Sequence, residues 1–296
     1  MPASPSMRPW LLAARPKTLP AALAPVMLGS ASAAAVEAFA PMPALLALLF
    51  AVLMQITCNF ANDYGDFMRG ADTPERLGPA RAVASGWVAP QAMRRAVVLL
   101  AAASFCTGLL LVFWGGWWLI GVGTICLLAC LAYTGGPFPL AYNGLGDVFV
   151  IVFFGFAAVL FTAYVQCGFF PAQAWVAAPA CGLLAANILV VNNARDMETD
   201  ARAGKRTTVV RYGRGFARAQ YALSMAFALA LPAVLLLLGS GPGALLPLLA
   251  SPVGIAMALG FCRVREPSAY NAWLGRTAAF LLAYAALFSL GILFGK

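Results

Sequence analysis

The chain has 296 residues, of which 62% are hydrophobic and 10% are charged, and its formal net charge is +9. A soluble domain carries about 45–50% apolar and about 25% charged residues, and a core of this size cannot bury the excess apolar surface. The composition therefore excludes a soluble enzyme, a disordered chain and a disulfide-stabilised secreted scaffold, and it favours an all-α protein with several membrane-spanning helices.

Nine apolar stretches are long enough to cross a bilayer, which takes about 20 mainly apolar residues. Short breaks that are rich in proline and glycine, or charged, separate these stretches, as expected between helices. In chain order they cover about 18–37, 43–62, 95–113, 116–133, 147–165, 172–193, 217–238, 243–262 and 272–294. The sequence therefore predicts nine transmembrane helices.

The basic residues lie on one side of this predicted arrangement. With nine crossings, every arginine and lysine except Lys296 falls on the side of the N-terminus. Cytoplasmic loops of membrane proteins are enriched in lysine and arginine. We therefore expect a multi-pass protein of the cytoplasmic (inner) membrane, with the N-terminus inside and the C-terminus outside. This topology, and not a nucleic-acid partner, accounts for the positive charge.

The acidic residues indicate two similar halves. All of them except Glu37 lie on the side of the N-terminus, and they concentrate after the second span, up to Glu75, and after the sixth. Each concentration begins with asparagines, turns acidic and then becomes basic with glycine, which is a weak internal repeat. We expect a single domain over 1–296. Its four-helix halves would cover about 1–146 and 147–271, with a ninth helix at about 272–294, around a central cavity.

Both acidic segments carry polar residues at helical spacing, because residues four apart share a helix face. These sets are Asn59 with Asp63, Asn62 with Asp66, and Asn192 with Asp196 and Asp200. A stripe of like charges destabilises a helix unless cations neutralise it. The chain has no histidine, and its seven cysteines lie almost entirely in apolar stretches. Oxygen ligands alone suit Mg²⁺ or Ca²⁺ better than zinc, so the segments predict a metal site of that kind.

The charge balance of such a site calls for an anion and for further cations. The carboxylates of Asp63, Asp66, Asp72, Asp196 and Asp200, taken with two Mg²⁺ and one diphosphate, would carry a charge of about −4. Basic residues follow both motifs and could compensate this charge. They are Arg69, Arg76, Arg81, Lys205 and Arg206. Metal ions and basic side chains together are a usual means of stabilising a departing phosphate.

Other interpretations of the acidic segments are open at this point. They could be solvated loop charges beside membrane helices, although two matching segments on one side disfavour this. A secondary transporter also has internal repeats and intramembrane acids, but these acids lie near one membrane face and not at the midplane. A scaffold or a cofactor-binding membrane protein would not require both segments.

The acidic segments resemble the motifs of the UbiA superfamily of intramembrane prenyltransferases. That family has nine helices and two Asp-rich motifs, NDxxDxxxD and DxxxD, on the second and sixth. Residues 62–66, NDYGD, are similar to the start of the first motif, and Asp196 and Asp200 match the second. The third Asp of the first motif would fall at Gly70, and the next acid is Asp72.

Within this superfamily the chain is most similar to the subgroup that prenylates 1,4-dihydroxy-2-naphthoate in menaquinone biosynthesis. The similarity lies in residues 14–20, 62–78, 133–137 with 144–147, and 192–213. It implies Mg²⁺-dependent transfer of a polyprenyl group from polyprenyl diphosphate to 1,4-dihydroxy-2-naphthoate, with loss of diphosphate and CO₂, giving demethylmenaquinol. The alternative within the superfamily is another aromatic acceptor, such as 4-hydroxybenzoate.

The resemblance also implies roles for single side chains. Asp63, Asp66, Asp196 and Asp200 would be catalytic through the metal, and Lys205 would act on the leaving group. Departure of diphosphate generates an allylic cation, which aromatic rings could stabilise. Asp147 is the candidate base for the acceptor hydroxyl, and its other interpretation is a helix-start acid. The remaining expected substrate-binding residues are Arg15, Lys17, Asn59, Asn62, Arg69, Asp72, Arg76, Arg81, Tyr133, Tyr142, Phe149, Phe153, Asn192, Asn193 and Arg206.

Overall fold

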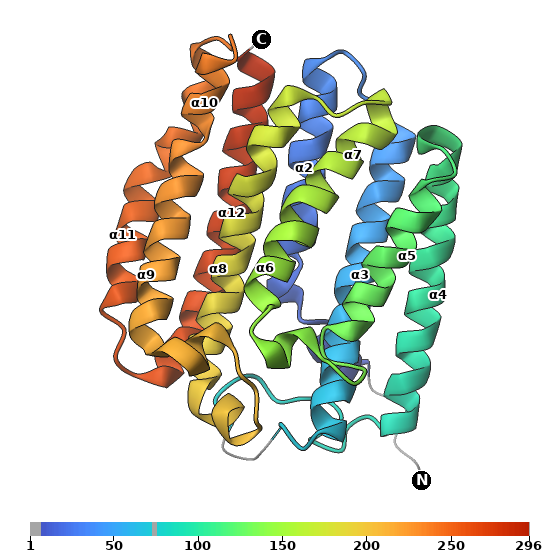
Figure 1. Cartoon of the computed structure of the whole chain (residues 1–296), viewed down its shortest axis with the longest axis vertical. Coiled ribbons are helices and arrows are strands. Elements are labelled where there is room, and N and C mark those ends of the chain that lie inside the picture. Colours follow the sequence, from blue (N-terminus) through green and yellow to red (C-terminus); the bar gives the residue numbers. More distant parts are fainter. Residues whose placement is uncertain (1–6, 73–75, 296) are drawn as a thin grey trace.

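The computed structural model describes residues 7–72 and 76–295, which form helices and connecting turns with no strand (Figure 1). The all-α prediction is confirmed. Glu75 and Lys296, which entered the topology prediction, lie outside the described residues. In chain order the helices are α1 (Arg8–Ala14), η1 (Pro16–Thr18), α2 (Pro20–Ala35), α3 (Pro41–Met68), α4 (Pro90–Gly115), α5 (Leu119–Ala132), η2 (Leu140–Asn143), α6 (Gly146–Val150), η3 (Ile151–Ala157), α7 (Ala158–Cys167), α8 (Ala172–Arg202), α9 (Thr208–Ala230), α10 (Pro232–Leu237), η4 (Pro242–Ala250), α11 (Ser251–Cys262), η5 (Pro267–Ala269) and α12 (Tyr270–Phe294).

Within the described residues, seven helices are long and apolar enough to cross a membrane. An eighth crossing results if α1 with η1 and α2, which meet at 50°, form one bent span. Helix α5 has 14 residues, which is short for a bilayer that takes about 20. A multi-pass membrane protein is therefore confirmed, whereas the predicted count of nine is not reached by helix length.

Helices α3 and α8 continue well beyond their apolar stretches. The prediction ended them near residues 62 and 193, but they end at Met68 and Arg202. The acidic motifs consequently lie on the last turns of long helices, where the spacing of four residues places their side chains on common faces. In Figure 1 these two helix ends lie at the same end of the bundle, beside the connection between α3 and α4.

Small side chains allow α8 to occupy the centre of the bundle, with 78% of its most apolar window buried. It packs closely against η3, a π-helical stretch within the span that α6 and α7 complete. A Cβ on Gly182 would lie 2.8 Å from the Ile151 carbonyl oxygen, and a Cβ on Gly155 would lie 2.8 Å from the Gly182 Cα. Only glycine at both positions permits this backbone contact. The contact fixes η3 and its aromatic residues against α8.

Candidate active site

The polar ends of α3 and α8 line a common cavity of about 160 Å³. Asparagines from both helices, Asn62, Asn192 and Asn193, are in its wall. Its charged wall residues are Arg15, Asp66, Arg76, Arg81, Asp147, Asp196, Asp200 and Lys205. The two acidic motifs, about 130 residues apart in the chain, thus meet across one cavity.

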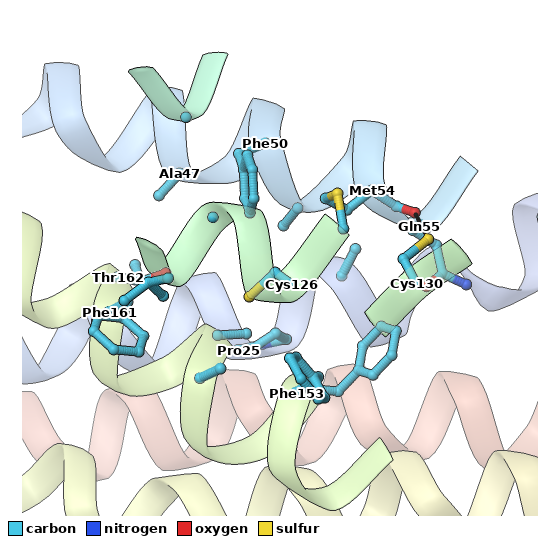
Figure 2. A pocket seen from close by; sticks show the side chains of 18 of the residues that line it. Pro25, Ala47, Phe50, Met54, Gln55, Cys126, Cys130, Phe153, Phe161 and Thr162 are labelled. Atoms are coloured by element: carbon cyan, nitrogen blue, oxygen red, sulfur yellow. Dashed lines mark hydrogen bonds between the residues drawn. The ribbon is translucent and has the colours of Figure 1, made fainter. Parts of the chain in front are cut away.

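A second cavity of about 160 Å³ adjoins the first, and it is apolar (Figure 2). Ala21, Gln55 and Phe154 belong to the walls of both. The apolar wall includes Phe50 from α3, Cys126 from α5 and Phe153 from η3. The site therefore has a charged chamber directly beside a hydrophobic one, which suits a ligand that has a polar head and an apolar tail.

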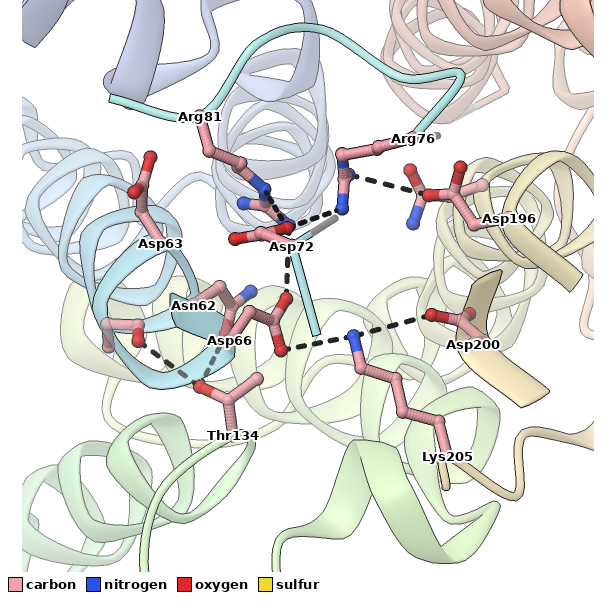
Figure 3. A network of polar contacts seen from close by, with 12 residues as sticks. Asn62, Asp63, Asp66, Asp72, Arg76, Arg81, Thr134, Asp196, Asp200 and Lys205 are labelled. Atoms are coloured by element: carbon pink, nitrogen blue, oxygen red, sulfur yellow. Dashed lines mark hydrogen bonds and ion pairs between the residues drawn. The ribbon is translucent and has the colours of Figure 1, made fainter. Parts of the chain in front are cut away.

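Asp66 contacts three different side chains at the charged chamber (Figure 3). Its Oδ2 lies 3.1 Å from Nη2 of Arg81, and its Oδ1 lies 3.0 Å from Nζ of Lys205. The Tyr142 hydroxyl also donates to Oδ1 at 3.0 Å. All of these groups are buried or partly buried, so the ion pairs are only weakly screened by water.

Two cations connect the first motif with the second. Arg76 lies 2.9 Å from Asp72 and 3.4 Å from Asp196. Lys205 spans from Asp66 to Asp200, at 3.0 and 3.4 Å. These bridges, drawn in Figure 3, hold the ends of α3 and α8 together across the chamber.

Arg195 is a site residue that the sequence interpretation counted only as a topological charge. Its Nε and Nη2 donate to the two oxygens of Asp196 at 2.8 and 2.7 Å. It also donates to Asn192 and to Asn271 of α12. The bidentate pair fixes the Asp196 carboxylate, as planar guanidinium groups do. The sequence signal that could have indicated this role is its position directly before Asp196, the first residue of the second motif.

The structure explains why glycine occupies position 70. Gly70 has φ +67° and follows the last turn of α3. The amide of Gly70 donates to Phe67 O, and the amide of Ala71 donates to Asp66 O, which closes the helix end. A left-handed residue at a helix C-terminus favours glycine over aspartate. The turn brings Asp72 to Arg76 and Arg81, at 2.9 and 3.5 Å.

Asp63 is directed away from the other carboxylates (Figure 3). Its two oxygens accept hydrogen bonds from the backbone amides of Ala82 and Val83, each at 3.0 Å. Asn59, one helical turn earlier, donates to Ala14 O and to the Thr18 hydroxyl. Neither side chain is in the wall of the charged chamber. These two predicted site residues therefore contact the supporting structure instead of the chamber.

Asp147, at the start of α6, faces the charged chamber from a third side. Its Oδ2 accepts a hydrogen bond from the Thr208 hydroxyl at 2.7 Å, while its Oδ1 is buried without a hydrogen-bond partner. Next to it, the rings of Tyr133, Phe149 and Phe153 form a row, with centroids 5.8 and 4.2 Å apart. Tyr133 lines the charged chamber and the two phenylalanines line the apolar one.

The remaining predicted residues divide between the chamber and its surroundings. Arg15 lines the chamber, and its Nη2 is buried without a hydrogen-bond partner. Lys17 and Arg206 are exposed and lie outside both walls. Arg69 donates to Thr134 O and Gly136 O, so it supports the turn that follows α5. Tyr142 holds Asp66, and Lys205 lies 5.0 Å from the centre of its ring.

Burial opposes the charges that these side chains carry. It raises the pKa of Asp72 to about 6, although the neighbouring Arg76 acts in the other direction. Burial alone would lower the pKa of Arg76 and Lys205, but the surrounding carboxylates raise both pKa values above their ordinary range. Arg76 and Lys205 therefore keep their positive charge, while the neighbouring cations only partly offset the effect of burial on Asp72.

The donor set fits a hard divalent ion that binds together with an anion. Among the residues that the structure describes, no three acidic, histidine or cysteine side chains are grouped closely enough to hold a metal alone. Asp72 Oδ2 and Asp147 Oδ1 are nevertheless buried carboxylate oxygens without a partner. Mg²⁺ is usually bound by one or two carboxylates, water and substrate phosphates. Such an ion needs no larger cluster of carboxylates than this chamber has.

The sequence matches the UbiA prenyltransferase family over residues 22–285. It is 39% identical to the 1,4-dihydroxy-2-naphthoate octaprenyltransferase of Escherichia coli, over 96% of this chain and 94% of that protein. The proteins of the same name from Mycobacterium tuberculosis and Bacillus subtilis are 41% and 30% identical, over 86% and 96% of this chain and 86% and 91% of their own.

Solved structures of UbiA homologues have the same fold. The apo structure from Aeropyrum pernix has a TM-score of 0.66 at 20% identity, over 92% of this chain and 96% of that one. The structure of an Archaeoglobus fulgidus homologue bound to DMAPP and Mg²⁺ has a TM-score of 0.62 at 18% identity, over 95% and 99%. The chain is therefore a prenyltransferase that belongs to the UbiA prenyltransferase family.

Proposed function

We propose that this protein transfers a polyprenyl group from polyprenyl diphosphate to 1,4-dihydroxy-2-naphthoate, releasing diphosphate and CO₂ and giving demethylmenaquinol. One observation carries the proposal. The two acidic motifs meet around a charged chamber, bridged by Arg76 and Lys205, and this chamber shares part of its wall with an apolar one. The pair of chambers matches the two parts of a prenyl diphosphate.

The choice of acceptor rests on the relatives. Proteins named 1,4-dihydroxy-2-naphthoate octaprenyltransferase, at 30–41% identity, include two that match 96% of this chain. An acceptor with a carboxylate fits a chamber to which Arg15 contributes an unpartnered Nη2. The alternative acceptor is another aromatic acid, such as 4-hydroxybenzoate.

Mg²⁺, in two ions, is the proposed cofactor, and Asp66, Asp72, Asp196 and Asp200 are its proposed ligands. Bound there, it would neutralise charge on the diphosphate as the C–O bond breaks. Asp63 was expected in this set, but both of its oxygens accept backbone amides. The Archaeoglobus fulgidus homologue with DMAPP and Mg²⁺ supports metal-dependent binding of a prenyl diphosphate in this fold.

Side chains of this protein would bind the diphosphate, exclude water and stabilise the prenyl cation. Arg76, Arg81 and Lys205 would bind the leaving diphosphate, where their charge counts most because the site is buried. The prenyl chain would lie in the apolar chamber, which also keeps water from the allylic cation. Phe149, which lies beside Tyr133 of the charged chamber, and its neighbour Phe153 would stabilise that cation through their ring faces.

Asp147 is the proposed base for the acceptor. Its free Oδ1 would take a proton from an acceptor hydroxyl, while Thr208 holds its Oδ2 in place. The ring carbon that bears the carboxylate would then form the new C–C bond with the prenyl cation. Loss of the carboxyl group as CO₂ restores the aromatic ring, and the proton returns to the oxygen.

We further propose nine crossings of the inner membrane, with α5 as the short one, in one domain of two four-helix halves and a ninth helix. This count puts the N-terminus and the charged chamber on the cytoplasmic side. The distribution of arginine and lysine supports it, because a wrong count would mix the basic loops between the two sides.

The test is product analysis with purified protein in detergent. The protein receives both aromatic acids, a mixture of prenyl diphosphates and Mg²⁺, and the products are identified by mass spectrometry. Demethylmenaquinol is expected, and EDTA should abolish its formation until Mg²⁺ is restored. Prenylated benzoate would select the alternative acceptor, and turnover that persists in EDTA would refute the metal-dependent mechanism. A transporter would form no product in detergent.

A further inference from the structure

Asp63 differs from the other motif carboxylates in what it contacts. Its side chain is buried, with the residue only 1% exposed, and it accepts the Ala82 and Val83 amides at 3.0 Å with one oxygen each. A carboxylate that accepts backbone amides forms strong, directed hydrogen bonds. The partners are backbone groups of the α3–α4 connection, so this carboxylate connects one chain segment to another.

The held segment carries two of the cations of the charged chamber. Ala82 follows Arg81 directly, and Arg81 reaches Asp66 and Asp72 at 3.1 and 3.5 Å. Arg76, at the other end of the segment, reaches Asp72 and Asp196. A shift of this backbone would move both guanidinium groups, because each side chain has a fixed reach.

A second attachment holds the same segment near Arg76. Nδ2 of Asn271, from α12, donates to Leu77 O at 2.8 Å. Gly78 packs on the Arg195 guanidinium, and a Cβ there would lie 2.7 Å from Nη2 of Arg195. Arg195 in turn donates to Asn271 at 3.1 Å. The segment Arg76–Val83 is thus fixed at one end by α8 and α12 and at the other end by α3.

We propose that Asp63 is a positioning residue: it fixes the segment Arg76–Val83 so that Arg76 and Arg81 bind the diphosphate, and it does not ligate the metal. The assignment rests on the proposed function, because the diphosphate of the prenyl substrate is the anion in question. It gives the first acidic motif two separate tasks, with Asp66 facing the chamber and Asp63 facing the segment.

The experiment compares the wild type with Asp63→Ala, and it uses Asp66→Ala as the contrast. Hydrogen exchange of the Ala82 and Val83 amides is measured by mass spectrometry in metal-free buffer. Two dissociation constants are then measured by calorimetry: that of inorganic diphosphate at fixed Mg²⁺, and that of Mg²⁺ at saturating diphosphate. Exchange tests the attachment independently of the reaction.

For Asp63→Ala we expect exchange at least about tenfold faster at these amides and diphosphate affinity about tenfold weaker, with the Mg²⁺ constant within about twofold of wild type. For Asp66→Ala we expect weaker Mg²⁺ binding and unchanged exchange. If Asp63→Ala does not fold, Asp63→Asn, which keeps one acceptor oxygen, should show the same changes at smaller size.

Three results would overturn the assignment: unchanged exchange in Asp63→Ala, unchanged diphosphate affinity despite faster exchange, or a loss of Mg²⁺ affinity equal to that of Asp66→Ala. A wild-type protein that binds no diphosphate with Mg²⁺ would instead refute the proposed function. The exchange rates would then still decide whether Asp63 holds the segment.

Discussion

Replacing Lys205 by methionine removes the cation that joins Asp66 and Asp200. At its distances of 3.0 and 3.4 Å, and with an effective dielectric constant of about 20, each pairing amounts to about 5 kcal/mol of Coulomb energy before desolvation is subtracted. Removing one partner of a buried ion pair typically destabilises a protein by about 3–5 kcal/mol. The loss of one donor to a developing anion typically lowers kcat by about 10²–10³.

We therefore expect Lys205→Met to lower kcat for prenyl transfer by about 10²–10³, and to lower the melting temperature of the metal-free protein. Lys205→Arg, which keeps the charge, should recover part of both. Arg202→Gln is the matched control, because Arg202 is an exposed cation at the end of α8. Initial rates by product chromatography and melting curves in detergent give the two readouts. A Lys205→Met rate within about threefold of wild type would refute a role for Lys205 in leaving-group stabilisation.

Three further results are expected. Because burial raises the pKa of Asp72 to about 6, from 3.8 in the unfolded chain, the folded protein binds this proton more tightly than the unfolded one. Stability of the metal-free protein should therefore fall as the pH rises from about 4 to about 6, by at most about 3 kcal/mol, and Asp72→Asn should remove that part of the pH dependence in melting curves. Asp147→Asn should lower kcat by about 10²–10⁴ with little change in KM. Thr208→Val, which removes only the hydrogen bond to Asp147 Oδ2, should lower kcat far less, so equal losses would contradict the assignment of Asp147 as base. Gly182→Val should destabilise the fold by about 1–3 kcal/mol, because its Cβ would lie 2.8 Å from the Ile151 carbonyl oxygen, and an unchanged melting temperature would show that this contact can relax.

Apolar content located the helices but not their ends. A stretch of about 20 apolar residues is a strong signal, and each predicted stretch corresponds to a helix or a broken helix. The last turns of α3 and α8 are polar, so hydropathy ends these helices too early. Their polar side chains are satisfied by partners far along the chain, such as Arg76 for Asp196. The bend before α2 and the π-helical η3 likewise depend on packing, which a single sequence does not reveal.

The motif residues were predictable as a set, because carboxylates four apart on a helix share a face. Asp66, Asp196 and Asp200 line the chamber as that spacing indicates. Asp63 is three residues from Asp66, so the two lie close together around the helix, and the spacing alone allows Asp63 to face the chamber as well. The free amides of Ala82 and Val83 compete for it, and the position of that loop was not predictable from periodicity. The role of Arg195 was not predicted for the same reason, since it depends on the position of Asn271 in the fold.

The charges of the chamber nearly cancel without any ligand. In the ion pairs at the chamber, four carboxylates face four cations, namely Asp66, Asp72, Asp196 and Asp200 against Arg76, Arg81, Arg195 and Lys205. The two other charged wall residues, Asp147 and Arg15, add one charge of each sign. Adding Mg²⁺ alone, or diphosphate alone, would leave a large uncompensated charge in a buried site, which is unfavourable. Two Mg²⁺ with one diphosphate add only about one positive charge.

This balance predicts that metal and diphosphate bind cooperatively. Calorimetry should give a Mg²⁺ dissociation constant at least about tenfold smaller in saturating diphosphate than in its absence, which corresponds to a coupling free energy of about 1.4 kcal/mol or more. Diphosphate affinity must rise with Mg²⁺ by the same factor, since coupling between two ligands is reciprocal. Equal Mg²⁺ affinity with and without diphosphate would mean that the carboxylates can release Arg76 and Lys205 to the metal unaided. The diphosphate would then not be part of the metal site, and the ion pairs of Arg76 and Lys205 would not contribute to the selection of the substrate.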